Sequence, residues 1–498
     1  MTTEQDSRAS DAVQLAETTT QPSSVVARTS TWSVWALFCL SVGALALTAL
    51  RGTQWIVSDI LIVDGLTAVM WVVVTFFSGI VHSYSRRYMA GDRDIERFYA
   101  RVFGFTLVVM TMTAANHVAL LAAAWLAMGL LMAGLIGHVR DWEQAQAAAT
   151  LARRYFLASS ALLAGSLSLL AWATGTTSIS GILAQADEIS TSVALVAVSA
   201  IVLAALIQSA LFPFHNWLLS SMTAPTPASA LMHAGFVNAG GILLTRFAPV
   251  VTLEVAVMSA VVLIGAVSAL LGQAMGLVQP NVKRKLGSST IAQMGFMIMQ
   301  CGLGFFAAAI AHLILHGFYK AYLFLSAGAS VEQTVPKDAK STDTGVSSVA
   351  IGAVTAVGAG VVFATLTGKS LLAFDSGTIL VLVVVLTTLT ATRDILRRAV
   401  LPATLRVAAV PIVVLSAITG YALLYNAIST ALSGVPMTDA PTELTAAHFL
   451  ALALFVVAYL ATEFGWHRSS TRLYVFLLNR SQPDSSTVLT TKAEYNDV

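Results

Sequence analysis

Charged side chains are scarce in this sequence of 498 residues. Asp, Glu, Lys and Arg make up 10% of it and hydrophobic residues 57%, whereas soluble domains carry about 25% charged residues. A water-soluble chain of this size could not bury so many apolar side chains, so its natural solvent is a lipid bilayer. The net charge of +2 is small, and no basic cluster is interleaved with aromatic residues, which argues against nucleic-acid binding.

Cysteine is also rare. The two cysteines, Cys39 and Cys301, both lie in apolar runs. They are most simply buried small hydrophobic residues, so the sequence predicts neither a disulfide framework nor a cysteine metal site.

Hydrophobic periodicity is missing from both ends of the chain. Residues 1–30 are rich in Thr, Ser, Gln and acids and are predicted to be a disordered tail. This segment is too long and too acidic for the n-region of a signal peptide. Residues 479–498 have the same character, which leaves residues 31–478 as the membrane domain.

Long apolar runs predict an all-α polytopic membrane protein. A spanning helix needs roughly 20 mostly apolar residues, and these runs do not alternate as the strands of a β-barrel would. We predict fourteen spans, within one or two, starting near Trp32, Asp59, Tyr99, His117, Tyr155, Ser192, Thr226, Val255, Ser288, Gly304, Ser347, Thr378, Val407 and Thr445.

The linkers between these spans alternate in charge. Positive residues gather on the cytoplasmic side of membrane proteins. Alternate linkers are basic, with Arg86, Arg87, Arg93, Arg97 and Arg101 in the first, then Arg140, Arg153 and Arg154, then Lys283, Arg284 and Lys285, then Arg393, Arg397, Arg398 and Arg406, and finally Arg468 and Arg472. The linkers between them carry mainly acids, namely Asp187, Glu188, Glu254, Asp439 and Glu443. We therefore expect both termini in the cytoplasm of a bacterial cell, with the chain in its inner membrane.

One apolar stretch carries three ionisable residues at helical spacing. His312, His316 and Lys320 are four residues apart, so they share one face of a helix. Charge within hydrocarbon costs at least about 2.5 kcal/mol, whereas imidazoles titrate near neutral pH and a buried lysine can lose its proton. We favour a proton relay over helix–helix hydrogen bonds. Paired histidines could also bind zinc, but no third ligand is evident nearby.

A further histidine follows a pair of prolines. His233 comes after Pro225-Thr226-Pro227, a pattern that can break a helix and free backbone groups to bind ions. Pro-Thr-Pro is more often an ordinary turn, but its pairing with an intramembrane histidine favours a functional role.

Two other charged residues have simpler alternatives. Lys369 lies in a long apolar stretch within Gly368-Lys369-Ser370, but a phosphate loop needs a glycine where Phe363 stands, so we reject nucleotide binding. It could instead extend to the membrane surface. Asp64 opens the second span and could simply cap its helix.

Four motifs resemble the antiporter-like membrane subunits of respiratory complex I and of multisubunit cation/proton antiporters. The resemblance extends from about Asp64 to Asp375 and rests on Val63-Asp-Gly-Leu-Thr67 with His82-Ser-Tyr-Ser85; on Pro213-Phe-His215-Asn-Trp217 with Ala224 through Ala234; on Val282 through Thr290; and on Ala311 through Ser326.

This resemblance implies two inverted five-helix repeats, at residues 99–247 and 255–394. Each repeat would contain a broken helix, near Gln208–Pro213 and Thr367–Ser370, and a polar axis near mid-membrane. The proton-path positions that it implies are His233, His312, His316, Lys320 and Lys369, with Asp64, His82, Gln208 and His215 as accessory residues.

The sequence departs from this family at two charged positions. The family has a glutamate after a tryptophan, whereas Trp125 is followed by Leu126, and the lysine position before Pro213 is Gln208. The pattern therefore resembles most the membrane subunits of DAB-type inorganic-carbon accumulation systems. That family implies a DabA-like partner resembling a zinc carbonic anhydrase and driven by a gradient of protons or sodium ions. We predict no catalytic residue, metal or cofactor in this chain itself.

Three functions remain open at this point. The chain could conduct protons to energise bicarbonate or CO2 accumulation by the partner. It could belong to a complex I-like or antiporter assembly coupled to redox chemistry or sodium, or it could anchor a peripheral enzyme without conducting. Neighbouring genes of the DabA type would favour the first function, and quinone or flavin subunits would favour the second.

Overall fold

The computed structural model describes residues 24–52, 54–327, 346–370, 373–398, 403–466 and 470–488. The first half contains the helices α2 (Val25–Arg51), α3 (Gly65–Tyr88), α4 (Ile95–Ala114), α5 (Val118–Ile136), α6 (Glu143–Thr174), α7 (Ile179–Ala184), α8 (Thr191–Gln208), α9 (Asn216–Ser220), α10 (Thr226–Ala234), α11 (Ala239–Arg246) and α12 (Ala248–Val251). The second half contains α13 (Val255–Val278), α14 (Val282–Gly302), α15 (Phe306–Ser326), α16 (Val346–Thr367), α17 (Ser376–Arg398), α18 (Ala403–Ala431), α19 (Ala446–Glu463) and α21 (Thr471–Arg480).

Short elements complete the fold. The strands β1 (Trp55–Val57) and β2 (Leu61–Val63) form an antiparallel hairpin. Single 3-10 turns are η1 (Ala186–Glu188), η2 (Ser221–Thr223), η3 (Phe236–Asn238) and η4 (Ser485–Thr487).

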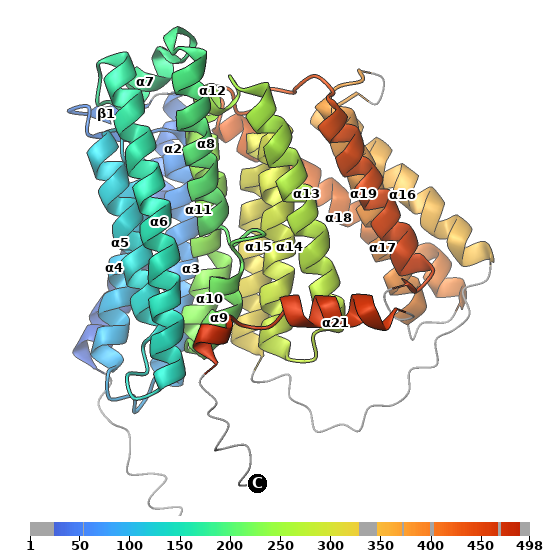
Figure 1. The fold of residues 1–498 in the computed structure, drawn as a ribbon, viewed down its shortest axis with the longest axis horizontal. Coiled ribbons are helices and arrows are strands. Elements are labelled where there is room, and N and C mark those ends of the chain that lie inside the picture. Colours follow the sequence, from blue (N-terminus) through green and yellow to red (C-terminus); the bar gives the residue numbers. More distant parts are fainter. Residues whose placement is uncertain are drawn as a thin grey trace, which may run out of the picture.

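The structure confirms an all-helical polytopic membrane protein. Twelve of the described helices are long and apolar enough to cross a membrane. The other two predicted spans, α4 and α14, are helices of 20 and 21 residues that lie among them (Figure 1). Their first turns carry charge, such as Glu96 in α4 and Lys283 in α14, which lowers their hydropathy.

Successive long helices run in opposite directions, so alternate connections lie at opposite ends of the bundle (Figure 1). The connections at residues 89–94, 137–142 and 279–281, which belong to the basic linkers, lie at the end that carries α21. The acidic η1 and the connection between α18 and α19 lie at the other end. The two charge classes predicted from the sequence are therefore separated in space.

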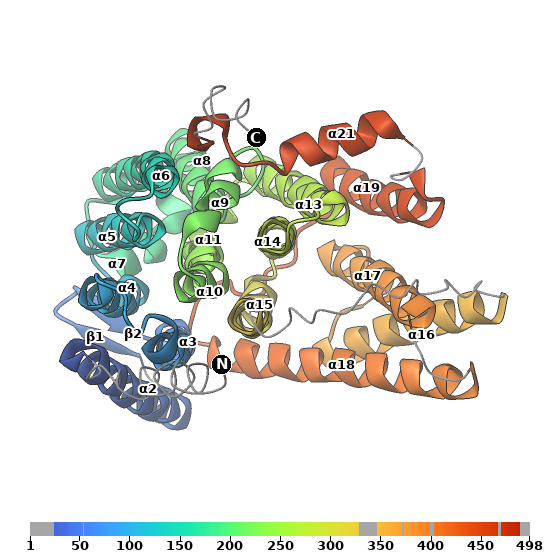
Figure 2. The same ribbon diagram turned by 90° about the horizontal axis from the view of Figure 1, so that it is seen from below.

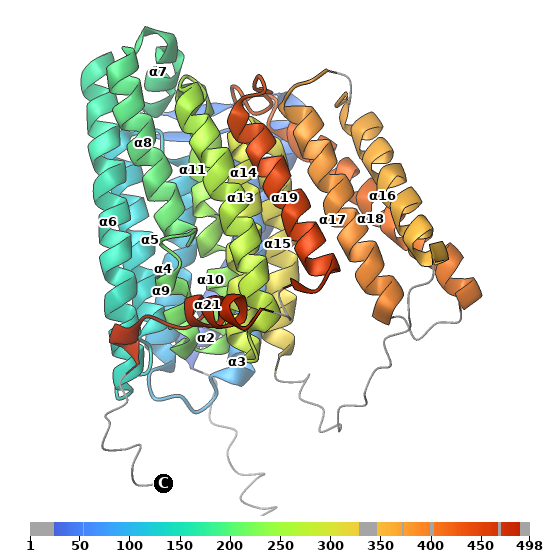
Figure 3. The same cartoon turned by 45° about the vertical axis from the view of Figure 1, so that its right-hand side comes forward.

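Helical structure stops at both predicted places, but only the first of them is a break within the bundle and the second is not a broken helix. α8 ends at Gln208 partway through the bundle, and the chain continues downward to α9 (Figure 1). The second interruption lies between α16 and α17, which pack side by side and run in opposite directions (Figure 3). It is therefore a turn between two spans, and Gly368 has the left-handed conformation (φ +68°) that commonly ends a helix.

The terminal boundaries also differ from those expected. α2 begins at Val25, inside the segment predicted as a tail. At the other end, α21 lies across the ends of the spans, and the chain from it to η4 packs beneath α9 and α13 (Figure 1). We call residues 471–487 the C-terminal strap.

Close contact between α13 and α14 depends on glycine. A Cβ atom at Gly272 would lie 2.4 Å from the backbone nitrogen of Ala292, and one at Gly295 would lie 2.4 Å from that of Ala269. Small residues at such crossings let two membrane helices approach closely. This contact fixes α14 beside α15, where the ionisable stripe lies.

Candidate functional site

α15 holds the predicted stripe at the centre of the molecule. This helix packs against α10, α11, α14 and α18 (Figure 2). The rings of His312 and His316 stack with their centroids 6.2 Å apart, and His316 and Lys320 are buried, with His312 half-buried. The three side chains thus follow one another along α15, as the four-residue spacing predicts.

The Lys320 ammonium is bound by dipoles. Its Nζ donates to the Leu286 carbonyl at 2.8 Å and to the Ser289 hydroxyl at 2.5 Å. In the part of the chain that the structure describes, no ion pair includes Lys320. Because no fixed anion holds its charge, a change of protonation state at this lysine breaks no ion pair.

His233 joins this cluster from α10. Its Nδ1 lies 3.0 Å from the Thr290 hydroxyl, which itself donates to the Leu286 carbonyl at 2.9 Å. When that hydroxyl proton is used in the bond to the carbonyl, Nδ1 carries the hydrogen and donates it to Thr290. Nε2 is then the proton-accepting nitrogen, and it is buried without a partner.

The Leu286 carbonyl is the centre of this arrangement. It accepts hydrogen bonds from Lys320, Ser289 and Thr290. The cluster therefore connects α10, α14 and α15. Both ring nitrogens of His316 are buried without a partner among the described residues, and its ring lies between Lys320 and His312 along α15. Four of the five predicted path residues are thus brought together: His233, His312, His316 and Lys320.

This set can pass protons but offers little for metal binding. Imidazole and amine groups in a low-dielectric interior can exchange a proton with a neighbour or a bridging water. Within the described residues, no three His, Cys, Asp or Glu side chains gather closely enough to hold a metal ion.

Lys369 lies apart from this cluster. It is in the turn between α16 and α17, at the end of the bundle opposite α21, and its Nζ is 3.8 Å from the centre of the Phe305 ring. Phe305 precedes His312 by about two turns of α15, or roughly 10 Å. Gln300 and Tyr421, whose side chains are hydrogen-bonded at 3.1 Å, belong to the neighbouring α14 and α18.

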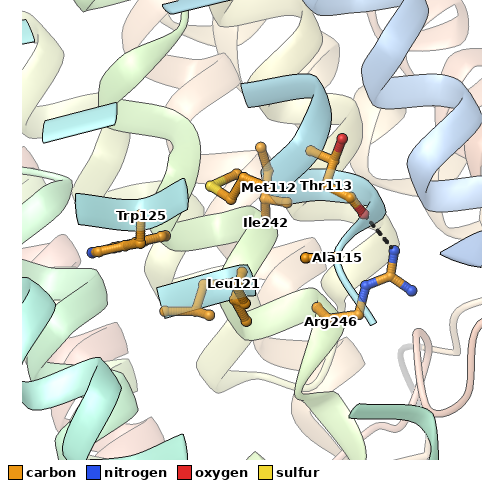
Figure 4. A pocket seen from close by; sticks show the side chains of 8 residues that line it. Met112, Thr113, Ala115, Leu121, Trp125, Ile242 and Arg246 are labelled. Atoms are coloured by element: carbon orange, nitrogen blue, oxygen red, sulfur yellow. Dashed lines mark hydrogen bonds between the residues drawn. The ribbon is translucent and has the colours of Figure 1, made fainter. Parts of the chain in front are cut away.

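Asp64 is a cap, as the simpler alternative predicted, but it is also half of a buried ion pair. It accepts a hydrogen bond from the Thr67 backbone at 2.9 Å and pairs with the Arg246 guanidinium from α11. Arg246 also donates to the Thr113 carbonyl at 3.0 Å, beside a small cavity lined by Trp125 (Figure 4).

His82 belongs to a helix–helix network. Its Nδ1 lies 2.8 Å from the Ser78 carbonyl, and the Ser78 and Thr106 hydroxyls are 2.5 Å apart. Tyr99 donates to the His82 carbonyl at 3.0 Å. These contacts join α3 to α4, and within the described residues no hydrogen bond links His82 to the Lys320 cluster.

Gln208 and His215 flank the break after α8. Gln208 is buried, and neither polar atom of its amide has a partner. The His215 Nε2 lies 3.3 Å from the Arg480 carbonyl of the C-terminal strap. Around the position of the absent glutamate, Trp125 donates to the Ser159 hydroxyl at 3.0 Å. Leu126 and Gln208 stand at the family's glutamate and lysine positions, and among the described residues no ion pair is formed at either position.

Sequence reasoning missed three features. Arg246 is an intramembrane arginine, and that rarity was the available signal. Tyr425 and Asp439 contact Lys369 but have no local motif. Residues 479–487 of the strap were assigned to the C-terminal tail because they lack hydrophobic periodicity, and residues 471–478 were assigned to the membrane domain.

Two family models match the chain. The model described as NADH:quinone oxidoreductase/Mrp antiporter, TM matches residues 115–390, more than half of the chain. The model described as NADH-Ubiquinone oxidoreductase (complex I), chain 5 N-terminus matches residues 58–99.

Curated relatives carry two kinds of name. A "Probable inorganic carbon transporter subunit DabB1" of Halothiobacillus neapolitanus is 37% identical over 58% of this chain and 52% of its own length. A "Probable inorganic carbon transporter subunit DabB" of Bacillus subtilis is 40% identical over 54% of this chain and 53% of its own length. An "NADH-quinone oxidoreductase subunit L" of Mycobacterium tuberculosis is 36% identical over 54% of this chain and 43% of its own length. The matched segment thus spans about half the length of the first two relatives.

Two solved structures share the fold. A chain of the Mrp complex from Dietzia sp. DQ12-45-1b has a TM-score of 0.56 and 22% identity, covering 95% of this chain and 52% of that chain. A chain of an archaeal membrane-bound sulfane sulfur reductase has a TM-score of 0.58 and 14% identity, and the match covers 92% of this chain and 93% of that chain.

Proposed function

Because the chain belongs to the NADH:quinone oxidoreductase/Mrp antiporter transmembrane family, we propose that it conducts protons across the membrane and so energises inorganic-carbon accumulation by a partner subunit. The observation that carries the proposal is the run of buried titratable groups along α15. Lys320, His316 and His312 follow one another, no ion pair within the described residues fixes their charge, and His233 joins them through Thr290.

The carbon substrate is inferred from the relatives. The chain is 36–40% identical to subunits named for inorganic-carbon transport. The partner would be a DabA-like subunit resembling a zinc carbonic anhydrase, because the hydration of CO2 must be supplied by another chain. The assembly would lie in a bacterial inner membrane, with the α21 end in the cytoplasm, where the basic linkers favour it. Protons are the preferred coupling ion because imidazoles exchange them near neutral pH.

A complex I-like role is the second candidate, since the Mycobacterium tuberculosis relative is similar to about the same degree. The two uncharged positions weigh against it. Leu126 and Gln208 cannot ionise, so a first half-channel built on a glutamate and a lysine is absent from this chain.

Purification of the tagged chain from its own host membranes, followed by mass spectrometry of the co-purifying subunits, tests the proposed partner. We expect a carbonic-anhydrase-like subunit containing zinc. Flavin or quinone subunits in its place would contradict the proposal and favour the second candidate.

Growth separates conduction from anchoring. We expect Lys320→Ala and His316→Ala to abolish growth in ambient air while membrane levels and assembly, checked by blot and co-purification, stay normal. Normal growth of both variants would contradict conduction and favour a non-conducting anchor.

A further inference from the structure

Three polar side chains from separate segments meet at the end of the bundle opposite α21. The Lys369 Nζ donates to the Tyr425 hydroxyl of α18 at 3.0 Å. That hydroxyl donates to Asp439 Oδ2 at 2.7 Å, and Lys369 Nζ lies 3.4 Å from Asp439 Oδ1. The three groups therefore form a closed ring of donors and acceptors.

The side chains of this trio differ in their exposure to solvent. The Lys369 side chain is 6% exposed, whereas that of Asp439 is 38% exposed. A lysine that simply extends to the surface would leave its ammonium in water. Here the ammonium is covered by the Phe305 ring at 3.8 Å, and the carboxylate is the member of the trio that reaches solvent.

The backbone holds Asp439 over the beginning of α15. Phe305 and Asp439 form an antiparallel bridge, and the Ala440 nitrogen donates to the Gly304 carbonyl at 2.9 Å. A Cβ atom at Gly304 would lie 1.9 Å from the Ala440 carbonyl oxygen, so only glycine permits this approach. The carboxylate is thus fixed at the end of the helix that carries His312, His316 and Lys320.

We propose that Asp439 is the outer terminus of the proton path and that Tyr425 links it to Lys369. This inference rests on the proposed proton conduction. The Lys369 ammonium gives a proton to the Tyr425 oxygen as the Tyr425 hydroxyl proton passes to Asp439. The products are a neutral amine, an unchanged phenol and a protonated carboxyl, which releases its proton to water.

The relay conserves charge at each step. Transfer converts an ammonium–carboxylate pair into a neutral amine and a neutral acid, which removes two charges from a partly buried place. Reversal of the same steps loads Lys369 from the outer solution, so the trio serves either direction of flow.

Proton flux in proteoliposomes tests this assignment. The purified complex is reconstituted with an entrapped pH-sensitive dye, and flux is started by a potassium diffusion potential. We expect Asp439→Asn and Tyr425→Phe each to lower flux at least about tenfold, which corresponds to about 1.4 kcal/mol in rate. Asp439→Glu should restore flux, and Glu443→Gln, which removes an exposed carboxylate from the same connection, should have no effect.

Chemical rescue distinguishes a proton terminus from a structural ion pair. Formate added on the Asp439 side should restore flux to Asp439→Asn, because a small weak acid can replace a solvent-accessible carboxyl, and it should not restore flux to Lys320→Met. Wild-type flux in Asp439→Asn or in Tyr425→Phe would overturn the assignment while leaving conduction intact. No flux in the wild-type complex would overturn both proposals. If Asp439→Asn fails to assemble, Tyr425→Phe decides the matter alone.

Discussion

His233 Nδ1 lies 3.0 Å from the hydroxyl of Thr290, a residue 57 positions away in the sequence. Because that hydroxyl also contacts the Leu286 carbonyl, to which Lys320 donates, it favours the tautomer with the hydrogen on Nδ1 and links His233 to the Lys320 cluster. No other hydrogen bond to the His233 ring is present among the described residues.

Replacing Thr290 with valine should therefore uncouple His233 from the cluster. Valine has a similar shape but removes both the donor and the acceptor, and Thr290→Ser keeps them. We expect Thr290→Val to lower proton flux about tenfold and Thr290→Ser to stay close to wild type. Equal flux in the two variants, in proteoliposomes of matched protein content, would show that the link is not used.

Gln208 and Lys369 should respond very differently to alanine. The Gln208 amide has no partner to lose, so Gln208→Ala should be mild, whereas Lys369→Ala removes a proton site from a region with few alternatives. Carbon uptake driven by an imposed pH gradient, at matched expression, measures this contrast. Arrested uptake in Gln208→Ala with normal uptake in Lys369→Ala would make the first repeat the conducting half.

The pair of Asp64 and Arg246 should be structural. Arg246→Met leaves a buried carboxylate unpaired, which costs about 3–5 kcal/mol of stability. The double variant Arg246→Met with Asp64→Leu removes the unpaired carboxylate and should recover part of that loss. Its recovery should be incomplete, because the lost helix cap costs about 1 kcal/mol. Unfolding titrations in mixed micelles measure both variants, and an unchanged unfolding free energy in Arg246→Met would contradict this role.

The C-terminal strap should loosen only in acid. Hydrogen bonds from Ser486 hold the pKa of Asp484 below its usual value of 3.8. A depressed carboxyl pKa stabilises the folded state above the unfolded value, and this contribution is lost as the pH falls through the folded value. We expect a spin label at Ser485→Cys, in a Cys39→Ser background, to stay equally immobile from pH 8 to about pH 5.

Mobility of that label should rise below about pH 4, and Asp484→Ala should show the same mobility already at pH 7. Loosening of the wild-type strap between pH 7 and 5 would point to another titrating group.

Periodicity was enough to predict the spans and the stripe, because both depend on local sequence. The spacing of His312, His316 and Lys320 dictates one face of one helix, whatever surrounds it. The placement of Lys369 was harder to foresee, since only Gly368 marks the turn within an apolar run.

The sequence carries no local pattern that predicts contacts between residues far apart in the chain. Arg246 lies 182 residues from Asp64, and Asp439 is separated by 70 residues from Lys369. Arg246 and Lys369 stand out as charges in apolar runs, but nothing in the sequence near either residue identifies its partner. Only the packing of α3 against α10, which leads into α11, and of the α18–α19 connection over α15 brings these pairs together.

Proton flux through the reconstituted complex with Lys320 replaced by methionine tests the account most directly. Methionine preserves an unbranched apolar side chain but cannot carry a proton, and the exposed Lys285→Met serves as the matched control. We predict that Lys320→Met abolishes flux at normal assembly and that Lys285→Met leaves it unchanged. Wild-type flux in Lys320→Met would show that protons do not pass along α15 and would contradict the account.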